Sequence, residues 1–284
     1  GSNNQAFGRD ALGADTLGSQ NVAIGRGALG SQNFTTATNV YNTAVGPSAG
    51  TAITSGTSNT LIGGLCGDSM TTGSSNTAVG VHAIGSGTVT GSDNTAMGFN
   101  AGSSLTSGSN NLFLGHDTGI TGSPGGAQTT ASNVIFLGDE NITNIYAAVS
   151  SIGTSDERDK TDFTALDLGL DFVKNLKPVT YYWDKRSKYG DKYAEDYDLN
   201  AQTPDGTHKE DWLDIGFKAQ EVVALEEAAG YTISDKTNLV SNLTADGTQY
   251  GLKYERFIPI LVKAIQDQDA IITALTARVA ALES

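Results

Sequence analysis

The stretch TSDERDK, residues 154–160, places a hydroxyl at Ser155 and an amine at Lys160. A serine becomes a nucleophile only when a base takes its proton, and a lysine can be that base only if its pKa falls far below about 10.4. Five residues along a regular α-helix separate two side chains by about 140°, so Ser155 must lie in a bend or extended segment ahead of any helix. A capping box of Thr154 and Glu157 at a surface turn accounts for the same residues without chemistry.

Other patterns typical of chemistry are weaker. GRGALG at residues 25–30 fits the dinucleotide-binding G-x-G-x-x-G, but no acidic residue follows at the spacing that would hold a ribose, and no helical pattern follows it. His82 and His116 lie in turn-like sequence without a second histidine, a cysteine or clustered carboxylates at ligand spacing, so we expect no metal site. Cys66 is the lone cysteine, which excludes an intrachain disulfide. We expect no cofactor.

Composition divides the chain into two halves. Residues 1–150 hold 27 of the 35 glycines, two basic residues and seven acidic ones, whereas residues 151–284 hold 15 basic and 24 acidic residues. The formal charge of -14 is therefore -5 plus -9. A chain that is acidic in both halves lacks the basic patch that nucleic acid or an anionic membrane requires. No apolar run approaches the ~18 residues of a membrane span, so we expect no membrane insertion.

A repeat dominates the first half. Its core is an asparagine, a small or polar residue, two mostly apolar residues and a glycine, and successive asparagines lie 17, 21, 17, 17, 18, 17 and 22 residues apart. The cores begin at Asn4, Asn21, Asn42, Asn59, Asn76, Asn94, Asn111 and, loosely, Asn133. Each unit offers one short strand and a tight turn, too little to bury a face alone. The units must therefore stack as a β-solenoid or β-roll, or wind around partner chains.

The chain begins inside a repeat, because GSNNQAFG at residues 1–8 parallels GSNNLFLG at residues 108–115. We therefore expect further repeats before residue 1, although Gly1 and Ser2 also match the remnant of a cloning site.

The second half predicts a small α/β domain. Apolar residues at intervals of three and four predict a helix that Gly169 interrupts and Pro178 ends: Phe163, Leu166, Leu170, Val173 and Leu176. VTYYW at residues 179–183 alternates as a half-buried strand does, and residues 184–212 are charged and turn-rich, which predicts an exposed excursion. Residues 214–230 predict a strand that runs into a helix and stops at Gly230.

The C-terminal residues carry a heptad pattern. Apolar residues alternate at spacings of three and four, with Gln268 in the one polar slot: Ile258, Leu261, Ile265, Ile272, Leu275, Val279 and Leu282. Such a stripe predicts a coiled coil and hence oligomerisation, and it does not by itself fix the number of chains.

Four motifs in the second half, SDERDK, LKPVTYYW, IGFKAQEV and YERFIPILVKAI, together resemble the C-terminal intramolecular chaperone of phage tail spikes and tail fibres. This is the endosialidase-type, self-cleaving peptidase S74 family, and the resemblance covers roughly residues 151–284. The repeats resemble, less closely, the Asn-Ala-Ile-Gly units of trimeric adhesin heads and phage fibres, with a longer period.

The resemblance implies three assembled chains, a fibre that the chaperone folds, and a cut that then releases the chaperone. Its catalytic dyad corresponds to Ser155 and Lys160, its cleavage site to Thr154 and Ser155, and Asp156 and Arg158 match the supporting motif. This chain departs from the family at Asp159, where an apolar residue commonly precedes the lysine. A negative charge there is expected to raise the pKa of the lysine.

We therefore expect a β-rich repeat fibre over residues 1–150, a chaperone domain over 151–257 and a trimerising helix over 258–284. The expected function is that of a homotrimeric phage tail fibre or spike, assembled in the host cytoplasm and carried on the virion tail, that binds a host surface receptor of unknown chemistry. The expected reaction is a single-turnover serine-lysine self-cleavage. The alternative is a structural receptor-binding fibre that trimerises and never cuts itself; more distant is a cellular trimeric adhesin or a membrane-bound transcription factor that uses the same module.

Overall fold

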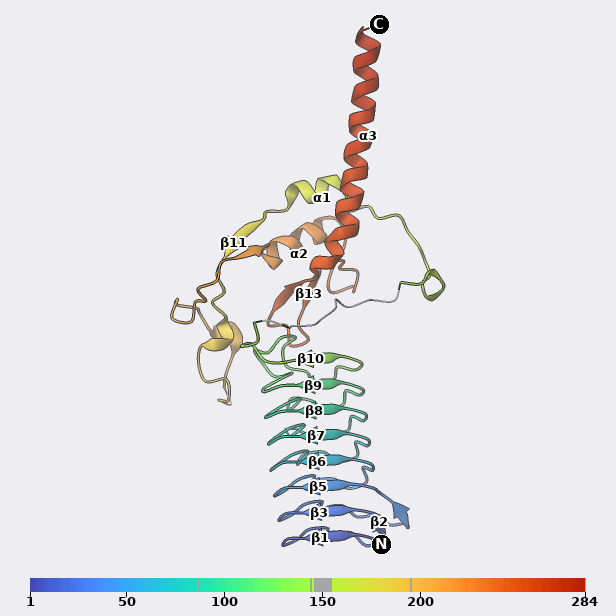
Figure 1. The fold of residues 1–284 in the computed structure, drawn as a ribbon, viewed down its shortest axis with the longest axis vertical. Coiled ribbons are helices and arrows are strands. Elements are labelled where there is room, and N and C mark those ends of the chain that lie inside the picture. Colours follow the sequence, from blue (N-terminus) through green and yellow to red (C-terminus); the bar gives the residue numbers. More distant parts are fainter. Residues whose placement is uncertain (86, 144, 146–154, 195, 284) are drawn as a thin grey trace. The chain divides into compact units, whose positions relative to one another are not determined.

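A computed structural model describes residues 1–85, 87–143, 145, 155–194 and 196–283. The chain forms two compact units (Figure 1). The first contains Gly1–Asn144, Asp184–His208 and Thr244–Gln249, and the second contains Ile145–Trp183, Lys209–Leu243 and Tyr250–Ser284. We refer to Gly1–Asn144 as the solenoid.

The solenoid is built on one parallel sheet of eight three-residue strands, stacked like rungs in Figure 1. The strands are β1 (Gln5–Phe7), β3 (Val22–Ile24), β5 (Thr43–Val45), β6 (Thr60–Ile62), β7 (Thr77–Val79), β8 (Thr95–Met97), β9 (Leu112–Leu114) and β10 (Ile135–Leu137). Each pairs residue for residue with the next, as in Thr60 with Thr77. A small parallel pair joins β2 (Gly18–Ser19) of the first turn to β4 (Thr38–Asn39) of the longer second turn. The expected β-solenoid is confirmed.

The core of the solenoid follows from the alternation of each strand. The middle residue of a rung points inward and the residues beside it point outward. From β3 to β9 the middle residue is fully buried: Ala23, Ala44, Leu61, Ala78, Ala96 and Phe113. Turn residues such as Ile53 and Met70 fill the remaining interior. A three-residue strand buries only one side chain, so stacking between turns supplies the core.

A ladder of asparagines runs beside the strands, exposed at Asn4 and buried from Asn21 onward. Oδ1 of Asn59 accepts the backbone N–H of Asn76 at 2.9 Å, and its Nδ2 donates to the carbonyl of Gly73 at 2.9 Å. The backbone contact recurs from each ladder asparagine to the next: Asn4, Asn21, Asn42, Asn59, Asn76, Asn94 and Asn111. The repeat asparagines therefore satisfy buried backbone groups at the start of each strand.

The last repeat departs from the sequence pattern. Leu112 pairs with Ile135, so the residue equivalent to Asn111 is Val134 and not Asn133. The N–H of Val134 bonds to Oδ1 of Asn111 at 3.2 Å and ends the ladder, while Asn133 accepts from Nδ2 of Asn110 at 2.8 Å. The extra residue in NVIFLG lies ahead of the three-residue strand Ile135–Leu137, and alignment on the asparagine misplaces the register by one.

The second unit contains α1 (Leu170–Asn175), β11 (Val179–Tyr181), β12 (Asp214–Gly216), α2 (Ala219–Ala228), β13 (Ser241–Leu243), β14 (Tyr250–Leu252) and α3 (Phe257–Glu283). β11 pairs antiparallel with β12, and β13 with β14.

The helix expected from Phe163 onward is shorter than the periodicity indicates: α1 begins only after Gly169, and Phe163 is 68% exposed. Glu226 on α2 is buried and accepts the N–H groups of Leu239, Val240 and Ser241, which ties α2 to β13.

The long helix α3 has two apolar faces. Phe257, Ile260 and Ala264 are buried, the first two in a core shared with Phe172 of α1. The heptad residues are all exposed, by 45% to 86%: Ile258, Leu261, Ile265, Ile272, Leu275, Val279 and Leu282. The helix is as expected, and its heptad stripe has no partner among the described residues of one chain. No helix in the described part of the chain is long and apolar enough to cross a membrane.

The excursion expected over residues 184–212 is exposed only in part. Segment 184–208 contains its buried residues. It belongs to the first unit, and Ser187 and Leu199 are buried there. Two short 3₁₀ helices, Arg186–Lys188 and Leu199–Ala201, give it local structure. Two of its lysines, Lys185 and Lys192, find partners on the solenoid, which a reading of local sequence does not reveal.

The glycine that ends a rung gives a direct test of the stacking. Gly63 has φ +141°, and a Cβ there would lie 2.4 Å from the carbonyl oxygen of Gly80. We expect Gly63→Ala to lower the free energy of unfolding by at least about 2–3 kcal/mol, because strain and the clash add. At the adjacent Gly64, the nearest atom to a Cβ is Pro47 Cγ at 3.7 Å, an ordinary contact. Gly64→Ala should stay within about 1 kcal/mol of the parent. Thermal melting measures both, and equal effects would contradict the stacking argument.

Candidate active site

The turn that contains the serine and lysine is built by a local cap. Asp156 is the N-cap of a 3₁₀ helix over Glu157–Asp159, and its carboxylate accepts the backbone N–H of Arg158 at 2.9 Å. The same carboxylate binds the Arg158 side chain, with Nη2 at 2.5 Å. The N-cap is thus Asp156, and the expected capping role of Thr154 lies outside the described residues.

The turn brings the two predicted dyad residues together. Lys160 follows the 3₁₀ helix in extended conformation, and its N–H bonds to the carbonyl of Glu157 at 3.1 Å. Its Nζ lies 2.6 Å from Ser155 Oγ and 3.2 Å from the Ser155 carbonyl oxygen. Ser155 precedes the helix, which is the condition that the five-residue spacing requires.

This geometry can perform proton transfer. As an ammonium, Lys160 donates to Ser155 Oγ; as a neutral amine, it accepts the hydroxyl proton over the same short distance. Both side chains are exposed, so the described residues of one chain leave the pair open to water. Thr154, which carries the carbonyl to be attacked, and the side chain of Asp159 lie outside the described residues.

Asp156 and Arg158 form an exposed ion pair next to the dyad. The hydrogen bonds from Arg158 hold the pKa of the Asp156 carboxyl below its usual range and raise the pKa of Arg158. Solvent screens an exposed pair, so its contribution to stability is small. Among the described residues, the polar contacts of these two side chains lie within the turn and join Asp156 to Arg158.

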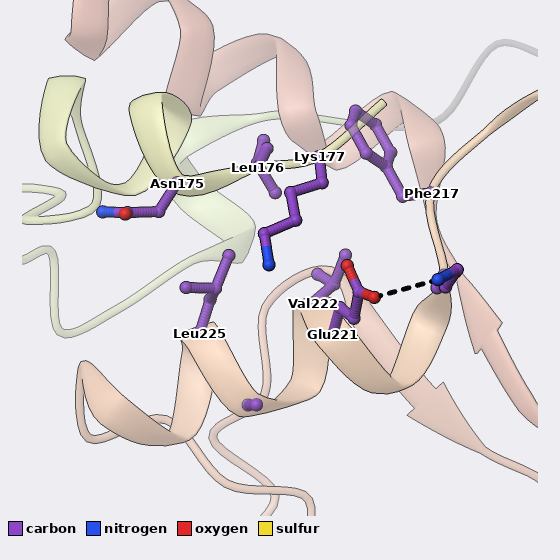
Figure 2. A pocket seen from close by; sticks show the side chains of 9 residues that line it. Asn175, Leu176, Lys177, Phe217, Glu221, Val222 and Leu225 are labelled. Atoms are coloured by element: carbon purple, nitrogen blue, oxygen red, sulfur yellow. Dashed lines mark hydrogen bonds and ion pairs between the residues drawn. The ribbon is translucent and has the colours of Figure 1, made fainter. Parts of the chain in front are cut away.

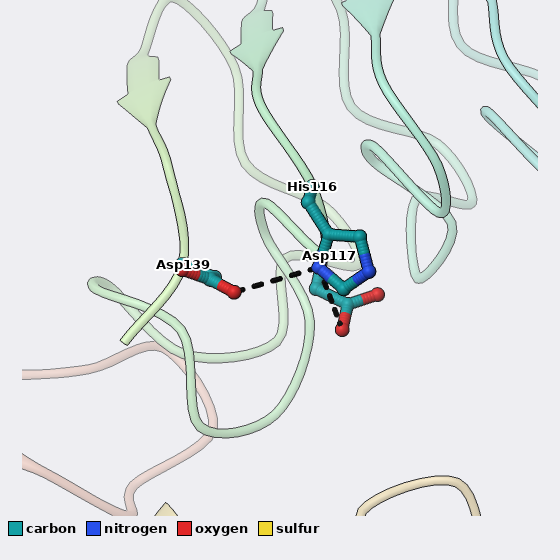
Figure 3. A group of neighbouring side chains, drawn as sticks. All are labelled: His116, Asp117 and Asp139. Carbon is teal, nitrogen blue, oxygen red and sulfur yellow. Dashed lines mark ion pairs between the residues drawn. The ribbon is translucent and has the colours of Figure 1, made fainter. Parts of the chain in front are cut away.

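A second group of ionisable side chains lies on the solenoid. His116 Nδ1 is 3.2 Å from Asp117 Oδ2 and 3.4 Å from Asp139 Oδ2 (Figure 3). The expectation that His116 has no carboxylates near it is wrong, because the last turn of the solenoid brings Asp139 back beside it. Burial alone raises the pKa of Asp139, but hydrogen bonds from Asn141 and His116 outweigh it and lower the pKa.

This cluster already contains a cation. Nζ of Lys192 lies 2.8 Å from Asp117 Oδ2, which is also the oxygen nearest to His116. An ammonium at that distance partly neutralises the carboxylates and repels a divalent ion. The donor set therefore gives no reason to assign a metal to His116, Asp117 and Asp139.

A shallow cavity of about 280 Å³ lies between the end of α1 and α2 in the second unit (Figure 2). Leu176, Val222 and Leu225 line it, and Lys177 reaches across toward α2. None of the dyad residues lines it, and its one ion pair, Lys218 with Glu221 at 3.2 Å, is exposed. The lone thiol is also unsuited to chemistry, because burial raises the pKa of Cys66 to about 12.

Two functional groupings escaped prediction from the sequence. Lys192 and Tyr193, which contact Asp117, lie more than 70 residues further along the chain. Glu226 accepts hydrogen bonds from backbone N–H groups 13 to 15 residues later. One signal was available for Asp117: it occupies a turn position that carries no charge in the five preceding turns.

Comparison with known proteins identifies the region that carries the dyad. A family model described as peptidase S74, chaperone of endosialidase, matches residues 155–231, so the matched region begins at Ser155. Searches of curated proteins and of solved structures returned no match.

Proposed function

Because the C-terminal region of this chain is a chaperone-of-endosialidase domain of the peptidase S74 family, we propose that the protein is a phage tail fibre or tail spike that cuts itself once. The chaperone assembles three chains in the host cytoplasm, drives folding of the solenoid and is released by a cut between Thr154 and Ser155. The solenoid remains on the virion tail, where it contacts a host surface receptor.

The observation that carries the proposal is the 2.6 Å contact between Lys160 Nζ and Ser155 Oγ at the first residue of the matched region. Domains of this family are typical of phage tail fibres and spikes, and the family suggests autoproteolysis. A nucleophile and a base in contact, at the junction between fibre and chaperone, support a cut at that position.

The proposed reaction begins when neutral Lys160 takes the proton from Ser155 Oγ. The oxygen attacks the carbonyl carbon of Thr154; the bond from that carbon to the Ser155 nitrogen breaks, and the lysine ammonium returns the proton to this nitrogen. The product is an ester between Thr154 and the Ser155 side chain. Water then hydrolyses the ester, which leaves a carboxylate at Thr154 and a free amine and hydroxyl at Ser155.

The exposed heptad stripe of α3 supports assembly. S74 chaperones act in trimeric fibres. The seven exposed apolar residues form one stripe along α3, and partner helices are needed to bury it. Three copies of this chain supply those helices and bring three solenoids together.

A non-cleaving structural fibre is the second candidate. The observation that favours it is the exposure of both Ser155 and Lys160, because a lysine acts as a base more readily where water is excluded. In that case the C-terminal region trimerises and stays attached.

Intact mass after expression decides between the two. We expect the chain to divide into pieces of 154 and 130 residues, the second being 284 minus 154. Ser155→Ala and Lys160→Ala should each leave a full-length, folded chain, and the double variant should be no more impaired than either single one. Hydroxylamine added during cleavage should give a hydroxamate at Thr154, since it intercepts an ester.

Glu157→Ala is the matched control, because Glu157 lies in the same turn and its side chain makes no hydrogen bond or ion pair with the described residues. It should cut as the parent does. A wild-type chain that stays uncut through folding and long incubation would favour the structural fibre, and a Ser155→Ala chain cut at the same bond would remove the serine from the mechanism.

Assembly is tested by light scattering. The uncut Ser155→Ala protein should have about three times the chain mass of 29.4 kDa. Ile272→Asp places a charge in the heptad stripe and should reduce the mass to that of one chain, whereas Thr273→Asp, one residue outside the stripe, should remain trimeric. A monomeric or dimeric parent would contradict the proposal.

A further inference from the structure

The polar residue in the heptad stripe of α3 has no partner within one chain. Gln268 occupies the heptad position that otherwise holds Leu261, Leu275 and Leu282, and its side chain makes no hydrogen bond with the described residues. It is exposed, as the apolar residues of the stripe are. Partner helices that bury the stripe also bury this amide, and a buried amide needs a hydrogen-bond partner.

Gln268 marks the point where α3 leaves its own domain. Just before it, Oδ2 of Asp267 accepts the backbone N–H of Leu170 at 3.1 Å. From Gln268 to Glu283 every residue is exposed. Contacts within one chain therefore leave open which layer of this part of the stripe meets which layer of a partner. Three earlier residues of the helix are buried: Phe257, Ile260 and Ala264.

The apolar layers of the stripe do not distinguish one register from another. They alternate between isoleucine or valine at one heptad position and leucine at the other, so helices that slip by one heptad still stack apolar layers on apolar layers. Such a slip places Gln268 against Leu261 or Leu275 of a neighbouring chain and leaves its amide unpaired. The desolvation cost of an unpaired amide therefore falls on the slipped registers and not on the aligned one.

In the aligned register the amides satisfy one another. Equivalent positions of three parallel helices meet on the axis of the coiled coil, so the Gln268 side chains form a ring. Each Nε2 donates to Oε1 of the next chain around the ring, and each Oε1 accepts from the chain before it. The polar layer is complete only when all three chains are at the same height.

The rim of the stripe carries opposite charges that favour the same alignment. Arg278 and Glu283 flank the stripe on opposite sides, and neither makes an ion pair with the described residues of one chain. In a parallel coiled coil, one flank of a heptad meets the opposite flank of the next heptad on the neighbouring chain. This geometry pairs Arg278 with Glu283 of the next chain in the aligned register, and a slip by one heptad separates them.

We infer that Gln268 is the residue that sets the register of the assembled protein: three copies of it form a hydrogen-bonded layer on the axis of the coiled coil and align the chains at some cost in stability. The partner of the stripe is two further copies of this chain. The inference rests on the proposed assembly of three chains and not on the proposed cut. A chaperone that aligns repeats with many equivalent registers must first align itself.

Disulfide trapping in the uncut Ser155→Ala protein measures the register directly. Ile272→Cys and Val279→Cys are introduced together; they lie one heptad apart, and Arg278 provides a tryptic site between them. After oxidation and digestion, aligned chains give links between like positions, whereas slipped chains link position 272 to position 279. The ratio of slipped to aligned links should rise at least about 10-fold in Gln268→Leu, the factor that an unpaired buried amide contributes.

Gln266→Leu is the matched control, because Gln266 is an exposed glutamine outside the stripe that makes no hydrogen bond with the described residues. It should change neither the ratio nor the melting temperature, whereas Gln268→Leu should raise the melting temperature, since an apolar side chain replaces a buried amide. Slipped links that stay rare in Gln268→Leu, an equal rise in both variants, or a melting temperature that does not rise would overturn the inference.

Failure of the proposed assembly gives a different result. A parent protein that forms no interchain links and has the mass of one chain refutes the trimer, and the inference with it. A trimeric parent whose links do not respond to Gln268→Leu refutes the inference alone, because other contacts between the chains then set the register. Neither outcome depends on whether the wild-type chain cuts itself.

Discussion

The hydrogen bond from the backbone N–H of one ladder asparagine to the side-chain oxygen of the previous one is the interaction on which the solenoid depends. Three-residue strands bury one side chain each, so they cannot by themselves fix the register of the next turn along the solenoid axis. The asparagine does so, because a buried amide that loses its partner costs about 1–3 kcal/mol. The strand-ending glycine completes the constraint, since any side chain at Gly63 meets the turn above it.

The same regularity creates a folding problem. Asn59 and Asn76 make equivalent bonds to the next turn, so a chain that skips one turn recovers nearly all of its contacts. The native register therefore has little local energetic advantage, and it needs a reference point outside the repeat. In the proposed function, the chaperone that assembles three chains supplies this reference. If the chaperone is then released as proposed, the stability of the fibre depends on the unfolding barrier.

Sequence alone predicted the features that repeat or that depend on local spacing. The 17-residue period and its asparagines led to the solenoid, and the heptads led to α3 with its exposed stripe. The requirement that Ser155 precede a helix also agrees with the turn that brings Lys160 to it. These features follow from short-range geometry and from side-chain periodicity.

The features that sequence did not predict depend on contacts between distant segments. Charge and turn residues made residues 184–212 resemble an exposed loop, although Lys192 is half-buried in contact with Asp117 and Glu140. Nothing in the local sequence indicates that Glu226 of α2 is buried, where it accepts the N–H groups of Leu239, Val240 and Ser241. The one-residue shift at Val134 arose because strand pairing, and not the asparagine, sets the register of the last turn.

The most direct test of the account is refolding from denaturant with and without the chaperone. Purified residues 1–154, separated after cleavage, and uncut Ser155→Ala protein are unfolded and diluted under the same conditions. The account predicts that the uncut protein regains its parallel β signal by circular dichroism and its trimeric mass, whereas the separated fibre aggregates or stays unfolded. Equal recovery of a folded trimer by residues 1–154 alone would contradict it, because the repeats would then contain all the information needed to set their own register.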